Sequence, residues 1–192
     1  MSYRSPGESR SLDSDMTTNS KLMSRHAIRA IVLGGLIAGF CDLTYATTYY
    51  AMRGVPAIRI PQSIASGVLG SDSFKGGWET AVLGVVLHFF TAFCAAALYY
   101  AASRKLKILL RWAPIAGMLY GAAIFFFMRR VVIPLSAVPH PKSPPHFIWS
   151  DFLVHVFLIG LPIALLVRHY SSQPLTQSIA PAARSVAAGD FL

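Results

Sequence analysis

Four ionisable residues stand out because each lies inside a stretch of otherwise apolar sequence. They are Asp42, His88, Asp151 and His155. A histidine close to a carboxylate can change its charge near neutral pH and can pass a proton on. Asp151 and His155 are four residues apart, a spacing that stacks two side chains on one face of a helix.

Three interpretations of these residues remain open. The first is structural, with the side chains hydrogen-bonding one another and fixing how helices pack. The second is a proton-linked site in which a carboxylate and a histidine act together. The third is a bound haem or metal ion held by His88 and His155. Which of them applies depends on how the surrounding elements place the four side chains.

The composition indicates a membrane protein. Of the 192 residues, 54% are hydrophobic and only 13% are charged. A soluble fold of this length could not bury so much apolar surface. The net charge of +9 is then expected from topology and from contact with anionic lipid headgroups, rather than from nucleic-acid binding. Cys41 and Cys94 lie inside apolar runs, so they form neither a disulfide framework nor a zinc pattern.

Four apolar stretches predict an all-α, polytopic membrane protein with four transmembrane helices. Each reaches the roughly 20 residues that a helix needs to cross a bilayer core, and backbone groups in lipid must be satisfied within the segment. Residues 1–26 are polar and Ser-rich, which predicts a disordered tail. Residues 169–192 are predicted to form a second tail. The predicted spans are residues 27–51, 80–102, 112–135 and 147–167.

The distribution of lysine and arginine predicts the orientation in a bacterial inner membrane. Five basic residues lie in the N-terminal tail and the start of span one, four in residues 104–111, and two after span four, Arg168 and Arg184. The remaining six lie toward the other side. Since short cytoplasmic loops carry an excess of positive charge, both termini and residues 104–111 are predicted to be cytoplasmic.

The first outer connection, residues 52–79, contains an amphipathic pattern. Ile60, Ile64 and Val68 recur every four residues and predict one apolar face. We expect a short interfacial helix near residues 60–70, between spans one and two. Either it is a lid over a pocket, or it is a spacer that lies on the membrane surface.

The second outer connection is rich in proline, which predicts a stiff and extended loop. His140 and His146 in this loop could bind a metal ion, although loop histidines are more often simply solvated. Just before the loop, Arg129 and Arg130 lie near the end of span three. One arginine is predicted to form an ion pair with Asp151, and the other to reach the lipid headgroups.

Small residues mark the faces on which the spans should pack. Gly35 and Gly39 are four residues apart on span one, as are Gly117 and Gly121 on span three. Such pairs let helix backbones approach closely. His88 shares a face with small residues of span two, so that face is predicted to point into the bundle.

Counting along the spans places three ionisable side chains at one depth. Asp42 lies about ten residues from the outer end of span one, and His88 and His155 each lie about eight residues into a span, at a rise of about 1.5 Å per residue. Charged residues in a span normally face the bundle interior. We therefore expect Asp42, His88 and His155 to converge there.

Three stretches resemble the YagU-like small bacterial inner-membrane proteins of unknown function. They are the second span around His88 with the basic turn after it, the glycine-paired third span, and the segment Ser150–His155 after the Pro-rich loop. The resemblance covers residues 80–168. It implies an acidic residue four positions before a histidine in the last span, and it implies no catalytic residue.

No motif indicates an enzyme. The sequence contains no Gly-x-Ser-x-Gly, no phosphate-binding loop and no His-Glu-x-x-His. Inverted repeats and broken midspan helices, which are typical of transporters, are not evident either. The leading hypothesis is a small non-enzymatic inner-membrane protein that has an intramembrane Asp/His cluster and needs no cofactor. The alternatives are a proton-responsive or proton-conducting membrane protein, and a haem- or metal-binding membrane subunit.

Overall fold

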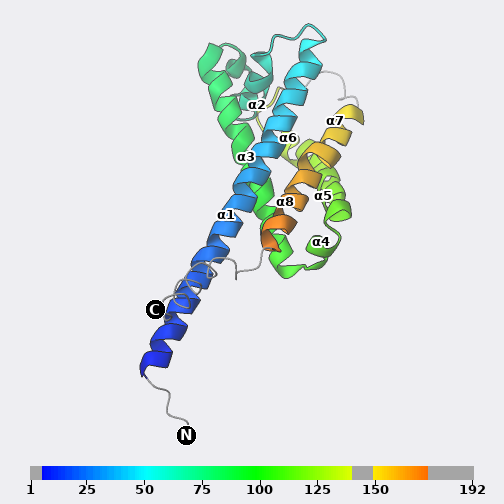
Figure 1. Cartoon of the computed structure of the whole chain (residues 1–192). Helices are drawn as coiled ribbons and strands as arrows, with labels where there is room; N and C mark the ends of the chain where they lie inside the picture. Colours follow the sequence, from blue (N-terminus) through cyan, green and yellow to red (C-terminus); the bar gives the residue numbers. More distant parts are fainter. Residues whose placement is uncertain (1–5, 140–148, 173–192) are drawn as a thin grey trace, which may run out of the picture.

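The computed structural model describes residues 6–139 and 149–172, with side chains described from Met23 onward (Figure 1). The described elements are helices, which confirms the predicted all-α fold class. Four helical stretches are long and apolar enough to cross a membrane, and their bounds lie within four residues of the predicted ones. The chain is therefore a multi-pass membrane protein. The spans are Met23–Ala51, Gly77–Lys105, Ala113–Leu135 and Trp149–Ser171.

Span one is the last part of a single long helix, α1 (Pro6–Ala51). The sequence predicted a disordered tail over residues 1–26, but the backbone is helical from Pro6 on. Proline suits a helix start because its missing N–H would have no partner there. Between Glu8 and Leu33 the sequence has neither glycine nor proline, and extending a helix that is already nucleated costs little per residue. From Pro6 on, the tail therefore continues the span.

A short helix, α2 (Arg59–Leu69), lies between spans one and two, as the sequence predicted. Its buried face differs from the predicted one. Val68 is 64% exposed, whereas Gln62, Ala65 and Ser66 are buried together with Ile60. The reason is that α2 packs against another helix through small and polar groups, instead of resting its apolar stripe on lipid.

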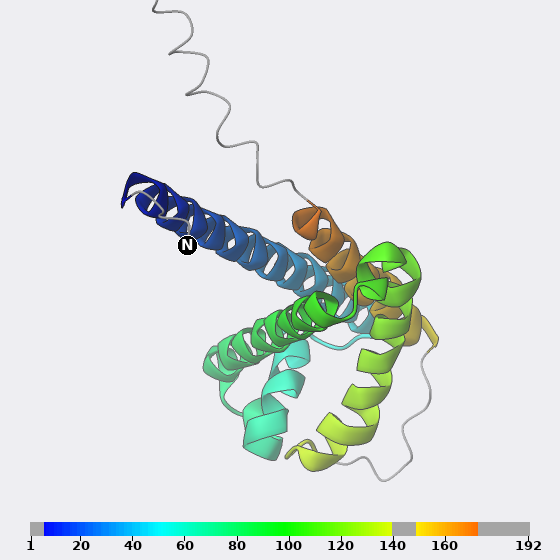
Figure 2. The same cartoon turned by 90° about the horizontal axis from the view of Figure 1, so that it is seen from below.

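The partner of α2 is the start of α3 (Gly77–Lys105), the second span. The side-chain amide of Gln62 donates to the carbonyl of Gly77 at 2.9 Å. Gly84 touches the Pro61 backbone so closely that a Cβ at this position would collide with the Pro61 carbonyl. At its other end, α2 accepts a hydrogen bond at the Gly67 carbonyl from the N–H of Ala137, just beyond span three. In Figure 2, α2 lies between α3 and the end of span three.

Spans three and four each contain one π-helical stretch. Span three consists of α5 (Ala113–Phe127), the stretch Met128–Val132 and α6 (Ile133–Leu135). Span four consists of α7 (Trp149–Val154), the stretch His155–Gly160 and α8 (Leu161–Ser171). Each stretch ends two residues before a proline, Pro134 or Pro162, whose missing N–H removes one helical hydrogen bond. The spans stay continuous, but they are not regular throughout.

Glycines allow close contacts between the spans, as predicted. On α1, Gly35 and Gly39 lie under the rings of Phe93 and Phe89 from α3. On α5, Gly117 and Gly121 touch the backbone of span four, including Gly160. The buried core lies toward the end of the bundle that carries the four-residue helix α4 (Ile108–Arg111). Its residues include Ala30, Ala96, Tyr99, Ile163 and Val167.

Candidate functional site

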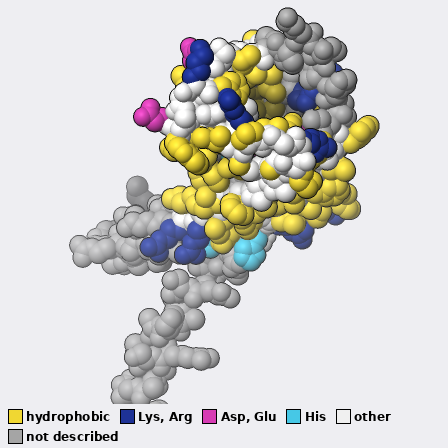
Figure 3. Space-filling model, turned by 90° about the horizontal axis from the view of Figure 1, so that it is seen from above, with side chains coloured by type: hydrophobic (Ala, Val, Ile, Leu, Met, Phe, Trp, Pro, Cys, Tyr) yellow, Lys and Arg dark blue, Asp and Glu magenta, His cyan; other side chains and the backbone are white. Residues whose placement is uncertain are grey.

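A cavity of about 640 Å³ lies in the bundle beneath α2. Side chains from α1, α3, α5 and span four form its walls, and Ile60 and Ser63 of α2 cover it. Seen from the α2 end, the surface is hollowed, with hydrophobic and basic side chains around the hollow (Figure 3). Cavities of about 300–1,000 Å³ are typical of small-molecule sites. Of the two sequence interpretations of α2, its position over this cavity favours the lid.

The first acidic group in the cavity is Asp42 of α1, which faces His88 of α3. The Nε2 atom of His88 lies 4.0 Å from Oδ2 of Asp42, and the two side chains are 13% and 21% exposed. The same nitrogen lies 2.8 Å from the carbonyl oxygen of Gly39. Because a carbonyl can only accept, Nε2 carries a hydrogen and donates it to Gly39. This bond fixes the ring between α1 and α3.

The second pair, Asp151 and His155, lies on span four. The Nδ1 atom of His155 donates to the backbone carbonyl of Asp151 at 2.9 Å and lies 3.5 Å from the Asp151 carboxylate. The edge of the His155 ring meets the Phe125 ring, with centroids 5.3 Å apart. His155 is also the first residue of the π-helical stretch. The four-residue spacing therefore produces the predicted stacking within one helix.

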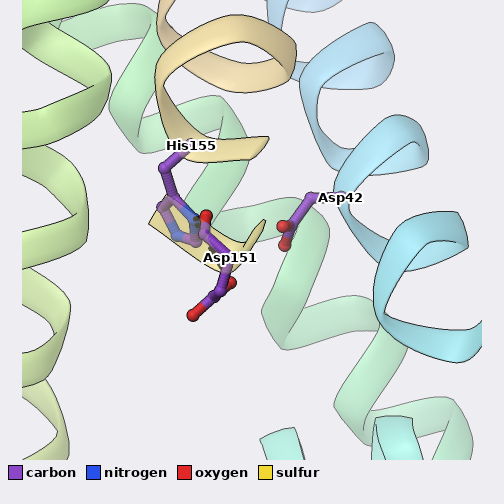
Figure 4. Close-up of side chains that lie close together, drawn as sticks. All are labelled: Asp42, Asp151 and His155. Carbon is purple, nitrogen blue, oxygen red and sulfur yellow. Dashed lines mark hydrogen bonds and ion pairs between the residues drawn. The ribbon is translucent and has the colours of Figure 1, made fainter. Parts of the chain in front are cut away.

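Asp42 joins the two pairs. One ligand atom each from Asp42, Asp151 and His155 lie within 4.8 Å of one another. Figure 4 shows Asp42 pointing from α1 toward the other two side chains. The structure thus brings together the four residues that the sequence analysis singled out, from three different spans and at one level. We call these four side chains the Asp/His cluster.

Two further polar side chains beside the cluster were missed by the sequence analysis. The hydroxyl of Tyr45 donates to Ser150 at 2.7 Å, which links α1 to span four next to Asp151. Arg59 of α2 lines the cavity and donates to the Phe74 carbonyl at 3.1 Å. A signal for Tyr45 existed, because it lies three residues after Asp42 and so shares its helix face. No comparable signal marked Arg59, whose position depends on how α2 packs.

The predicted ion pair between an arginine and Asp151 is not what the described residues show. Asp151 forms its ion pair with His155. The guanidinium carbon of Arg129 lies 5.5 Å from the centroid of the Phe125 ring, a cation–π contact. Arg130 is exposed. His155 lies one helical turn from Asp151 on the same helix, so it reaches this carboxylate more readily than an arginine of span three does.

The cluster suits a small ion better than a haem. Carboxylate and imidazole atoms bind transition metals at about 2.0–2.2 Å, so ligand atoms within 4.8 Å of one another need only a small closure. A haem held by both His88 and His155 would have to displace the Asp42 carboxylate, which lies 4.0 Å from His88 and within 4.8 Å of a ligand atom of His155. The loop histidines His140 and His146 lie outside the described residues.

No protein-family model, curated protein or solved structure matches the chain. Cys41 and Cys94 are free thiols, in agreement with their apolar surroundings in the sequence.

Proposed function

We propose that the chain is a small, non-enzymatic protein of a bacterial inner membrane whose Asp/His cluster takes up protons from the outer side. One observation carries the proposal: two carboxylate–imidazole pairs share a cavity and meet at Asp42. The excess of basic residues at the other end supports an α2 end that faces outward and cytoplasmic termini. The resemblance to the YagU-like proteins supports the location.

The charges of the cluster support proton uptake. With both carboxylates ionised and both imidazoles neutral, the cluster carries two negative charges. Protonation of His88 or His155 would make the ring an imidazolium, whose positive charge is shared by both nitrogens, and one nitrogen of each ring lies 4.0 Å or 3.5 Å from a carboxylate oxygen. Two protons therefore neutralise the cluster. In a poorly solvated site, the attraction between an imidazolium and a carboxylate is stronger than in water.

The other walls of the cavity define what surrounds the cluster. Arg59 brings a positive charge from α2, and Tyr45 brings a hydroxyl from α1. From span three, Ile124 and Met128 contribute apolar side chains. The cluster is therefore a polar patch in a mainly apolar cavity, beneath a helix that carries one cation.

The buried core supports a proton-responsive site rather than a proton-conducting one. Between the cluster and the α4 end, α1, α3 and α8 pack through fully buried residues such as Ala30, Ala96 and Ile163. A relay needs hydrogen-bonding groups or water within reach of one another. These apolar side chains offer a proton no partner, and the core hydroxyls of Tyr99 and Tyr120 already donate to backbone carbonyls. In vesicles that carry a pH-sensitive dye, we expect the same slow proton leak for the wild type and Asp42→Asn, and a faster leak for the wild type would indicate conduction.

Titration of the histidine rings tests proton uptake directly. We would follow the ring nitrogen signals of ¹⁵N-histidine-labelled protein in detergent between about pH 4 and pH 9, a window around the ordinary imidazole value of about 6.5. The variants are His88→Gln, His155→Gln and Asp42→Asn, with His169→Gln on the far end of α8 as the matched control. If the cluster is shared, removing one ring should shift the titration of the other, and Asp42→Asn should shift both.

The control and two outcomes decide the test. His169→Gln should leave the signals of His88 and His155 unchanged. Independent titration of the two rings would refute a shared site. Rings that keep one protonation state over the whole range would refute proton uptake and leave the structural interpretation.

A divalent metal ion is the second candidate, because three ligand atoms lie within 4.8 Å of one another. Two carboxylates and one imidazole are ligands that suit Mn²⁺, Fe²⁺ and Zn²⁺. Cobalt(II) added to chelator-treated protein should then produce visible absorption bands. Asp151→Asn should abolish them and His169→Gln should not. Bands that survive Asp151→Asn would exclude this site.

A further inference from the structure

A second hollow lies at the opposite end of the molecule, between α3, α4 and α5. Its volume is about 700 Å³. In Figure 2, α3 and α5 run apart from a common region near α4. The hollow opens between these two helices, and we call it the α3–α5 groove. Its lining includes Leu98, Ala102, Ile108, Trp112, Ile115 and Leu119.

The tyrosine hydroxyls of the α3–α5 groove are already hydrogen-bonded to the protein backbone. The Tyr99 hydroxyl donates to the Leu109 carbonyl at 3.1 Å, and the Tyr120 hydroxyl donates to the Ala95 carbonyl at 2.7 Å. The polar atoms of these two rings are thus already paired. An occupant of the groove meets hydrocarbon and aromatic surface, which suits an acyl chain and not a polar solute.

Basic residues are interspersed in the sequence with residues that line the groove, namely Ala102, Ile108 and Trp112. Arg104, Lys105, Lys107 and Arg111 lie in the turn that joins α3 to α5, and all four are exposed. The sequence contains no acidic residue between Glu79 and Asp151. The turn therefore carries four positive charges, and the sequence on either side of it between these two acidic residues is free of negative charge. Because it connects two spans, it lies at the level of the lipid headgroups.

We infer that the α3–α5 groove binds an anionic phospholipid, with one acyl chain in the groove and the phosphate group against the basic turn. Lining and basic residues are neighbours in the sequence, since Lys107 precedes Ile108 and Arg111 precedes Trp112. This adjacency suits a phospholipid, in which one glycerol unit joins the phosphate to the acyl chains. Basic pockets between spans on the cytoplasmic side are typical anionic-lipid sites. This site is independent of the proposed proton uptake, because it lies at the other end of the bundle and shares no lining residue with the cavity.

Trp112 provides a local probe of the groove. It lines the groove and is 53% exposed, so a lipid chain can touch its ring. The test uses a variant with Trp78→Phe and Trp149→Phe, which keeps Trp112 as its single tryptophan. This protein is reconstituted in phosphatidylcholine vesicles that contain a small fraction of lipid brominated on its acyl chains. Bromine quenches tryptophan fluorescence only at contact, so quenching reports occupancy.

Brominated phosphatidylglycerol should quench Trp112 more than the same fraction of brominated phosphatidylcholine. One basic side chain near an anionic lipid corresponds to about a fivefold preference, so the apparent preference should be at least about fivefold. Lys105→Gln with Lys107→Gln should lower it severalfold. Ala116→Phe, which fills the groove and changes no charge, should reduce quenching by both lipids.

The matched control removes two positive charges, as the Lys105/Lys107 variant does, at the same end of the bundle. Arg25 and Arg29 of α1 are exposed and do not line the groove, so Arg25→Gln with Arg29→Gln should leave the preference unchanged. Equal quenching by the two lipids would overturn the inference. The inference would also be overturned if the Lys105/Lys107 and Arg25/Arg29 variants lost the preference for phosphatidylglycerol equally. Such a result would show a general attraction of anionic lipid to the protein surface. If Ala116→Phe keeps the full preference, the groove is not the binding site.

Discussion

Substitution of Gly121 by alanine should destabilise the contact between spans three and four. A Cβ at this position would meet the carbonyl oxygen of His155, lie 2.7 Å from its carbonyl carbon, and lie 2.8 Å from the Cα of Val156. All three are backbone atoms, so rotation of a side chain cannot relieve the overlap. The two helices would have to move apart.

The size of the effect follows from these distances. Carbon atoms in favourable contact lie about 3.5–4.0 Å apart, so the helices must separate by roughly 1 Å locally. Overpacking of this kind costs about 1–3 kcal/mol. Alanine in place of glycine regains about 0.5–1 kcal/mol of helix propensity. We expect a net loss of about 1 kcal/mol in the free energy of unfolding, within a range of roughly 0–2.5 kcal/mol.

Gly34 is the matched control for Gly121. It is also a glycine inside a span, but a Cβ there would lie 3.6 Å from the Cβ of Ala96 and 3.8 Å from the Cα of Ile163, which is ordinary contact. Gly34→Ala should therefore keep the gain in helix propensity without the overlap. The assay is thermal unfolding of both variants in detergent, where 1 kcal/mol corresponds to about 2–4 °C in Tm for a chain of this size.

Gly121→Ala should unfold several degrees below Gly34→Ala. It should also shift the ring signals of His155, because the substitution displaces the backbone of that residue, and Gly34→Ala should not. An unfolding temperature for Gly121→Ala equal to or above that of Gly34→Ala would refute the close packing of spans three and four.

Three further predictions concern other parts of the chain. A reporter that is active only in the cytoplasm should be active when fused to the C terminus, and activity of a periplasmic reporter there would reverse the orientation. Gln62→Ala removes hydrogen bonds to Gly77 and Thr80, so amide hydrogen exchange in α2 should become faster, at a cost of about 1 kcal/mol; unchanged exchange would contradict this anchoring role. The hydrogen bond and charge of Lys75 lower the pKa of Asp72, so their mutual stabilisation is complete above the ordinary aspartate range and is lost as pH falls through the lowered pKa. Because both side chains are exposed, Asp72→Asn should leave Tm at pH 7 unchanged, and a clear drop would show that the pair matters more than an exposed ion pair should.

Hydropathy by itself predicts the fold class and the four spans. A helix must satisfy its own backbone in lipid and must be long enough to cross it, so length and apolar content are sufficient signals. The same local logic explains why Asp151 and His155 could be paired in advance, since four residues make one helical turn. The helical start at Pro6 was not predicted, because polarity measures burial and says little about whether a helix continues past a span.

The depth of Asp42, His88 and His155 also follows from counting along the chain. Their convergence needed more, because depth along a helix says nothing about its rotation. Rotation is set by contacts between distant segments, such as Gly121 against the His155 backbone and the bond from His88 to Gly39.

Only the tertiary structure determines which face of α2 is buried where this helix covers the cavity. The pattern Ile60–Ile64–Val68 predicted a helix and an apolar face, but α2 buries Gln62 and Ser66 instead. The partner of that face is α3, where Gly84 admits the backbone of α2 and Gly77 accepts the hydrogen bond from Gln62. A sequence pattern records which side chains are apolar. It does not record which neighbour will satisfy a polar one, because that neighbour is supplied by packing between elements.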